Sequence, residues 1–315
     1  MFRFIYVRLL FVISCMVFLI SCHSKKQSIV EIGQVDFMKI SQHYNNASKV
    51  PKRINISENI RVGTYFEFMD SLVRKYDTLM PYTLSEHLLV RHNPWIMDTL
   101  ANTDYYRMIA RDSFVYNQRQ MIVLPKGSHL IIPDSLSACT ILENFANTEI
   151  DINIPEFKLR IYQDSILLYT FPVRVGQHRE RYLKFGDRIT DLRTKIGKGS
   201  IVKHVKYPDF YNPVNGAQFY VTKRDDGKTT MMPQIPWIET EINNIRNGQM
   251  IHPTTNPKTL GKAYSNGCIG IGEADAWTIY YHTPLGTKIT LRYDLEVYDE
   301  GVVLSILRDV YGLSN

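Results

Sequence analysis

The sequence predicts a mainly β fold, a sandwich or open barrel, for residues 151–297, preceded by a smaller mixed α/β region over residues 61–150. Apolar and polar residues alternate from 157 to 162, which is the period of a half-buried strand. Asp226-Gly227 is a strong hairpin signal. Helical spacing is clear in this half only over residues 273–281, so strands dominate its secondary structure.

The elements of the β half follow from the same patterns, taken in chain order. The expected strands cover residues 157–162, 166–175, 218–222 and 288–293. The helix over 273–281 has an acid, Glu273, near its start, which suits the helix dipole. A second helix is predicted within the C-terminal segment 298–315, because Val303, Ile306, Leu307 and Val310 have helical spacing.

The region before residue 151 divides into a polar stretch and a folded part. Residues 22–60 are polar with little periodicity, and we expect a tether there. Residues 66–111 have a helical pattern. Two short strands are expected at 121–124 and 130–133, on either side of a turn that contains Gly127.

The N-terminus has the pattern of a signal peptide over residues 1–21. Arg3 and Arg8 precede a short apolar core, and Leu19-Ile20-Ser21-Cys22 resembles the bacterial lipobox, in which the cysteine is acylated. A second match ends at Cys15, and an uncleaved anchor or an ordinary secretion signal are the alternatives. The preferred interpretation is a lipoprotein anchored to the membrane through Cys22, on the periplasmic side of the cell envelope.

Charge and cysteine content narrow the function classes. The net charge of +6 falls to +4 without the leader, which holds two arginines and no acid, and there is no basic block, so nucleic-acid binding is not expected. Of the four cysteines, only Cys139 and Cys268 remain outside the leader and the lipidation site. They either form one disulfide or leave a buried, inert Cys139 and a reactive Cys268. No Cys/His metal set and no cofactor are predicted.

Cys268 stands in a polar, glycine-containing turn that suits a nucleophile. His252 precedes it by 16 positions at the end of an expected strand, and imidazole can hold the thiol partly as thiolate. Gly267 permits the tight backbone that would aim the Gly267 and Cys268 amides at an oxyanion. The alternative is a packed cysteine, a packed histidine and a common Asn-Gly turn.

At these residues the sequence resembles the YkuD-type L,D-transpeptidase family, whose signature is a histidine, a loop and then Ser/Thr-His-Gly-Cys. His252, Ser265, Gly267 and Cys268 occupy those places. The resemblance extends over residues 151–295 through the segments 159–176, 191–199, 275–277 and 286–287. Separately, residues 127–133 resemble the end of a LysM sugar-binding module, so the region 61–150 is either a degenerate LysM-like unit or a structural cap.

Three positions depart from the family pattern. Asn266 replaces a histidine, Pro253 replaces a glycine, and Gly270 replaces an arginine that would brace the loop or meet a carboxylate. Arg224, Arg193 and Lys195 are the candidates to compensate for the missing guanidinium.

The resemblance implies a YkuD-like β-sandwich with one or two helices, and a cysteine L,D-transpeptidase acting on peptidoglycan stem peptides. His252, oriented by the Pro253 carbonyl, would deprotonate Cys268, and the acyl-enzyme would form with release of D-Ala. Ser265 and Asn266 belong to the oxyanion loop, with Ser265 bracing it. Tyr264, Arg224 and Tyr211 are the candidate groove residues.

Two further interpretations remain beside transfer to an amine of a second stem. Water or another amine would make the same chemistry an L,D-carboxypeptidase or a protein-attachment reaction. A wall-binding lipoprotein without activity is the alternative from a different class. The sequence leaves the oligomeric state and the choice between inner and outer membrane open.

Overall fold

The computed structural model describes residues 53–299 and 302–313. The signal segment, Cys15, Cys22 and most of the predicted tether lie outside the described residues. By its internal contacts the described chain divides into two units: residues 75–84 belong to one, and residues 53–74 and the described residues from 85 onward form the other, which is compact. Among the described residues, no helix is long and apolar enough to cross a bilayer.

The N-terminal part is built from short helices with polar caps. Its helices are α2 (Tyr65–Tyr76), α3 (Glu86–His92), α4 (Trp95–Ala101), α5 (Tyr105–Ile109) and α6 (Ser135–Ala146). Ser85 caps α3, Asp104 caps α5 and Asp134 caps α6, each accepting backbone N–H bonds of the first turn. Sequence reasoning missed α6, although Asp134 is a helix-start signal, because Leu136 and Leu142 on this helix are exposed and blur the apolar stripe.

Four short strands pair within this part. They are β1 (Arg53–Asn55) with β4 (His129–Ile131), and β2 (Ile60–Arg61) with β3 (Ile122–Leu124). The predicted tether of residues 22–60 is therefore wrong at its end. Ile56 and Ile60 are buried, and the polar residues around them conceal this contribution to the core. The glycan-binding interpretation of residues 127–133 stays a prediction.

An eight-stranded sheet forms the second part, in the order β17-β15-β14-β11-β18-β5-β6-β7. Its strands are β5 (Thr148–Asn153), β6 (Lys158–Gln163), β7 (Ile166–Pro172), β11 (Gly197–Val205), β14 (Trp237–Ile242), β15 (Met250–Pro253), β17 (Ile269–Ile271) and β18 (Lys288–Arg292). Neighbours are antiparallel except for β15 with β17 and β18 with β5. The predicted mainly β class is confirmed.

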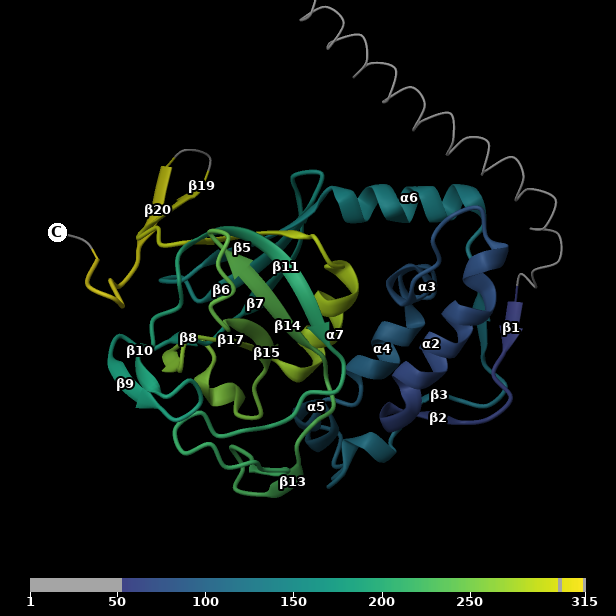
Figure 1. The fold of residues 1–315 in the computed structure, drawn as a ribbon, viewed down its shortest axis with the longest axis horizontal. Helices are drawn as coiled ribbons and strands as arrows, with labels where there is room; N and C mark the ends of the chain where they lie inside the picture. The colour runs from purple at the N-terminus through teal and green to yellow at the C-terminus, as the bar shows by residue number, and fades with distance from the viewer. Residues whose placement is uncertain (1–52, 300–301, 314–315) are drawn as a thin grey trace, which may run out of the picture. The chain divides into compact units, whose positions relative to one another are not determined.

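Helix α7 (Glu273–His282) connects β17 to β18 and contacts α3, α4 and β15, so it lies between the sheet and the N-terminal helices (Figure 1). Its aromatic face is buried. Trp277 packs against Phe66 with ring centroids 6.0 Å apart, and the Tyr281 hydroxyl donates to Glu86. The predicted helix over 273–281 is confirmed.

Small strand pairs complete the sheet region. They are β8 (Val175–Gly176) with β16 (Ala263–Ser265), β9 (Glu180–Leu183) with β10 (Arg188–Asp191), and β12 (Val221–Lys223) with β13 (Thr229–Met231). The last pair turns at Asp226-Gly227, where Gly227 has a φ of +84°, so the hairpin signal is confirmed.

The predicted C-terminal helix over 298–315 is wrong. Residues of this segment form β19 (Glu296–Asp299) and β20 (Val302–Ile306), an antiparallel pair. Val302 and Val303 are β-branched and favour strand, and the residues with helical spacing meet no core that would select a helix, since Val303 and Ile306 are exposed. Beyond β20, Tyr311 is buried and contributes to the site described next.

Candidate active site

His252 lies on β15, and Cys268 immediately precedes β17, the parallel neighbour of β15. The register pairs Ile251 with Ile269 and His252 with Gly270. Ile251 and Ile269 are fully buried on one face, so alternation places His252 on the opposite face. Cys268 immediately precedes β17, two residues before Gly270, and its side chain belongs to the same face as that of His252. The fold thus brings together the two residues predicted to react.

The imidazole of His252 is held from two directions. Its Nδ1 lies 3.0 Å from the carbonyl oxygen of Pro253, as predicted, and the Trp237 ring lies at 4.8 Å between centroids. Because a carbonyl only accepts hydrogen bonds, Nδ1 carries the proton and Nε2 keeps the lone pair. This tautomer is the one that can accept a proton from a thiol.

Burial makes the neutral forms of both groups the resting state. It lowers the pKa of His252 to about 4, an effect that the Arg174 charge increases and the Pro253 carbonyl opposes. Burial raises the pKa of Cys268, against the effects of the Met250 backbone and the Arg174 charge. The expected partial thiolate is therefore not the resting form. The arrangement supports proton transfer to His252 as the sulfur attacks.

The loop before Cys268 is braced by Ser265. Its hydroxyl donates to the Cys268 carbonyl at 2.5 Å and accepts from the Gly267 N–H at 3.2 Å. Gly267 has a φ of +110°, which only glycine adopts without strain. The bracing role predicted for Ser265 is present. The prediction that the Gly267 amide faces an oxyanion is not matched, because this amide is engaged with Ser265. Asn266 is half-buried between them.

A second set of hydrogen bonds, made by Thr194 and Tyr311, also holds this loop. The sequence analysis did not predict these bonds. The Thr194 hydroxyl donates to the Gly267 carbonyl at 3.0 Å and accepts from the Gly176 N–H at 2.8 Å. The Tyr311 hydroxyl accepts from the Thr194 N–H at 3.1 Å and donates to the Gly176 carbonyl at 2.9 Å. Tyr311, beyond β20, therefore supports the loop before Cys268.

Arg224 is not a groove residue, contrary to prediction. It is 2% exposed and its guanidinium donates to Glu273, Thr230 and Gln118. This network joins the β12–β13 hairpin to the start of α7. Buried and paired, Arg224 cannot reach a substrate.

Nor do Arg193 and Lys195 replace the missing guanidinium at position 270. Both bind Asp191 near the surface. The side chain that lies over Gly270 is Arg174, which the sequence did not single out.

The remaining predicted residues lie at the surface or apart. Tyr264 is 60% exposed, and its carbonyl accepts from the Gln177 side chain at 2.9 Å. Tyr211 is also exposed and stacks on Phe185. Among the described residues both cysteines are free: Cys139 on α6 is exposed, and Cys268 is half-buried. The predicted alternatives of a Cys139–Cys268 disulfide and of a buried Cys139 are both wrong.

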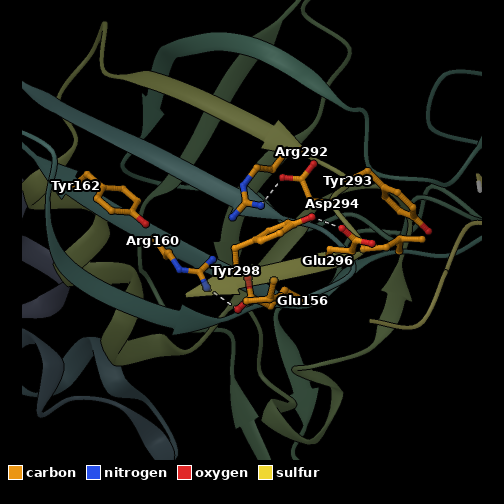
Figure 2. Close-up of a pocket in the computed structure, with 10 residues that line it drawn as sticks. Glu156, Arg160, Tyr162, Arg292, Tyr293, Asp294, Glu296 and Tyr298 are labelled. Carbon is orange, nitrogen blue, oxygen red and sulfur yellow. Dashed lines mark hydrogen bonds and ion pairs between the residues drawn. The ribbon is translucent and has the colours of Figure 1, made fainter. Parts of the chain in front are cut away.

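A cavity of about 690 Å³ lies away from this pair, and Figure 2 shows its lining. It is bounded by β6, the end of β18 and the segment leading into β19. Its arginines already have acidic partners in the chain, Arg160 with Glu156 and Arg292 with Asp294 (Figure 2). Arg292 also pairs with Asp151. The cavity contains neither Cys268 nor His252 and does not define the reactive site.

The YkuD family model, described as the L,D-transpeptidase catalytic domain, matches residues 147–291. This segment runs from the start of β5 into β18 and contains Cys268 and His252.

Two similar proteins are named as L,D-transpeptidases. The chain is 25% identical over 174 residues to the probable L,D-transpeptidase ErfK/SrfK of Escherichia coli. The alignment covers 54% of this chain and 51% of the relative. The chain is 23% identical over 165 residues to the putative L,D-transpeptidase YkuD of Bacillus licheniformis, covering 52% and 74%. The chain thus spans about half the length of the E. coli relative.

Solved structures give similar matches. An L,D-transpeptidase from Mycobacterium smegmatis matches 46% of this chain and 58% of its own, with 15% identity and a TM-score of 0.33. An L,D-transpeptidase from Xylanimonas cellulosilytica matches 77% and 98%, with 11% identity and a TM-score of 0.34.

Proposed function

We propose that this chain is a cysteine L,D-transpeptidase of the cell envelope that acts on peptidoglycan stem peptides. The observation that carries the proposal is that His252 on β15 and Cys268, just before the adjacent β17, share one face, and that the Pro253 carbonyl leaves the lone pair of His252 on Nε2. The family match over residues 147–291 supports the reaction class.

The proposed acylation begins with transfer of the Cys268 thiol proton to His252 Nε2. The sulfur forms a bond with the carbonyl carbon between the third and fourth stem residues, and the Cys268 amide is assigned to the resulting oxyanion. The carbon–nitrogen bond then breaks, and the leaving D-Ala amine takes the proton from His252. The product is a thioester on Cys268.

Deacylation reverses these roles. A side-chain amine of a second stem loses a proton to His252, attacks the thioester and forms a 3–3 cross-link, and the thiol recovers its proton. Ser265 and Thr194 keep the loop in place through both steps. Tyr264, exposed beside the loop, is assigned to the rim of the groove, and the exposed Tyr211 to its outer part.

The location is part of the proposal. Acylation at Cys22 would anchor the protein to the membrane and hold the catalytic part on the periplasmic side. Metabolic labelling with a fatty acid tests this, with Cys22→Ala expected to lose the label and Cys15→Ala to keep it. The reverse result would move the anchor to Cys15.

Intact-mass measurement after incubation with a carbapenem tests the chemistry. We expect one adduct on the wild-type protein and on the Cys139→Ser control, and no adduct on Cys268→Ala. An adduct that persists in Cys268→Ala, or no adduct on any protein, contradicts the proposal.

Muropeptide analysis of a strain without the gene then identifies the acceptor. Loss of 3–3 cross-links supports transfer to a stem amine, whereas accumulation of tetrapeptides alone would show an L,D-carboxypeptidase.

A further inference from the structure

Arg174 occupies the place where a side chain at position 270 would lie. Arg174 and Gly270 form an antiparallel bridge with two backbone hydrogen bonds of 2.8 Å. A Cβ added to Gly270 would lie 2.7 Å from Arg174 Nε and 3.2 Å from its Cζ. The guanidinium therefore rests directly on the backbone of Gly270, and the absence of a side chain there makes room for it.

This contact places a positive charge beside the reactive pair. His252 on β15 pairs with Gly270 on β17, and Gly270 in turn bridges to Arg174, which immediately precedes β8. Residues opposite one another in a sheet share a face, and such strands lie about 4.8 Å apart. Arg174 thus belongs to the face that holds His252 and Cys268, and its charge lowers the pKa of both.

Arg174 has no acidic partner among the described residues. Its Nε is buried without a hydrogen-bond partner, and its Nη1 donates to the Thr259 hydroxyl at 3.3 Å. Arg224 shows the contrast, because it is buried with Glu273 as its counter-ion. Burial of a guanidinium without an anion is unfavourable, and here it lowers the pKa of Arg174. An anion from outside the chain would complete the site.

We propose that Arg174 binds the free carboxylate of the acyl donor's leaving residue, beside the carbonyl that Cys268 attacks. The proposal rests on the proposed function, in which the leaving D-Ala carries an α-carboxylate three bonds from the attacked carbon. A guanidinium forms paired hydrogen bonds with such a carboxylate. Arg174, just before β8, thus supplies the cation missing at position 270, and with it the preference for donors that end one residue after the scissile bond.

Two matched peptides isolate this interaction. They are L-Ala-D-isoglutaminyl-L-Lys-D-Ala with a free C-terminus and the same peptide as a C-terminal amide, so that the terminal carboxylate is the only one present. Calorimetry with Cys268→Ala protein measures binding without turnover. We expect the acid to bind about 10- to 100-fold more tightly than the amide, the range of a charge-assisted hydrogen-bonded pair.

Arg174→Gln in this background should reduce acid binding to the level of the amide and leave amide binding within about twofold. Arg174→Lys keeps the charge without the fork and should give an intermediate preference. Arg246→Gln, an exposed arginine on another part of the sheet region, is the matched control and should keep the full preference.

A second variant, Gly270→Ala, gives an independent test in case Arg174→Gln does not fold. Gly270→Ala leaves Arg174 in the chain but displaces its guanidinium, and should reduce the preference for the acid in the same way. Circular dichroism checks the fold of each protein.

If Cys268→Ala protein with Arg174 and Gly270 intact binds the acid and the amide equally, or binds neither detectably, the assignment of Arg174 is overturned. An equal loss for both peptides in Arg174→Gln, which would show a structural role, also overturns it. Failure of the proposed function is a separate result, seen as no carbapenem adduct on a protein with Cys268 intact.

Discussion

His252 is held by the carbonyl of its own neighbour, Pro253, at 3.0 Å from Nδ1. The backbone supplies the orienting group here, so the site needs no acidic third member to fix the tautomer. A carbonyl also opposes the burial effect on the imidazole less strongly than a carboxylate would, and the pKa of His252 stays at about 4.

The neutral pair predicts an unusual acid limit for acylation. The second-order rate of carbapenem acylation should stay level as the pH falls from 7 and decline by about tenfold per pH unit only below the His252 pKa of about 4. Stopped-flow or quenched-flow mass measurements give the rates, and circular dichroism at each pH confirms that the protein is folded. A midpoint near 6.5, the ordinary histidine value, would contradict the lowered pKa of His252 on which this prediction rests.

Removal of the Ser265 hydroxyl should loosen the nucleophile loop without unfolding the chain. Ser265→Ala deletes the bonds to the Cys268 carbonyl and the Gly267 N–H, and we expect acylation to slow by about tenfold or more. Ser265→Thr keeps a hydroxyl and is the control. Acylation by the alanine variant at the wild-type rate would show that these bonds do not position Cys268.

The Tyr311 hydroxyl joins the C-terminal segment to the loop support. Tyr311→Phe leaves the Thr194 N–H and the Gly176 carbonyl without this partner, and we expect a loss of about 1–3 kcal/mol in the free energy of unfolding by urea. Tyr298→Phe removes an exposed hydroxyl and should change stability little. Equal effects of the two substitutions would argue against the support role of Tyr311.

The buried Arg224–Glu273 pair should matter for stability. Arg224→Met leaves Glu273 unpaired in the interior and is expected to cost about 3–5 kcal/mol. The double variant Arg224→Met/Glu273→Leu should recover much of this loss. The matched surface change is Arg246→Met, whose pair with Glu241 is exposed and worth about 0–1 kcal/mol. If urea unfolding gives similar losses for Arg224→Met and Arg246→Met, the pair is not a structural anchor.

Two half-buried histidines, His87 and His204, have buried Nε2 atoms and predict acid sensitivity of the fold. His87 and His204 stack at 5.0 Å, and burial lowers the pKa of His204 to about 4 and that of His87 well below its ordinary value. As the pH falls, His87 and His204 are therefore protonated in the unfolded chain at a higher pH than in the folded protein. Stability is complete above about pH 6.5 and is lost as the pH falls towards 4.

Melting temperatures across this interval measure the effect. The double variant His87→Asn/His204→Asn should show a smaller slope with pH, even if its melting temperature is lower throughout. An unchanged slope would assign the acid sensitivity to other groups.

Local patterns were sufficient to predict much of the β-rich half. Strand alternation located β6, β7 and β18, and the Asp226-Gly227 signal located the β12–β13 hairpin. The spacing and chemistry of His252 and Cys268 predicted residues that the register does bring together. These features depend on residues close in sequence or on a motif with its own chemistry.

Other features depend on pairing between distant segments. Arg174 reaches the site only through its bridge to Gly270, and Tyr311 only because the described segment after β20 lies against Gly176 and Thr194. Arg224 has a side chain of the kind that binds anionic substrates, but in the structure it is buried in an ion pair with Glu273, which is distant in sequence. The C-terminal helix was predicted from spacing alone, and strand pairing decided otherwise.

The most direct test of the central claim is a burst measurement with the stem tetrapeptide itself. Rapid quenching of wild-type protein with donor and no acceptor should release close to one D-Ala per protein molecule in the first turnover, with the tripeptide acyl group on the Cys268 tryptic peptide. Cys268→Ala and His252→Asn should show neither product in that time. Release of D-Ala without an acyl group on Cys268, or an equal burst from Cys268→Ala, would contradict the assignment of Cys268 as the nucleophile.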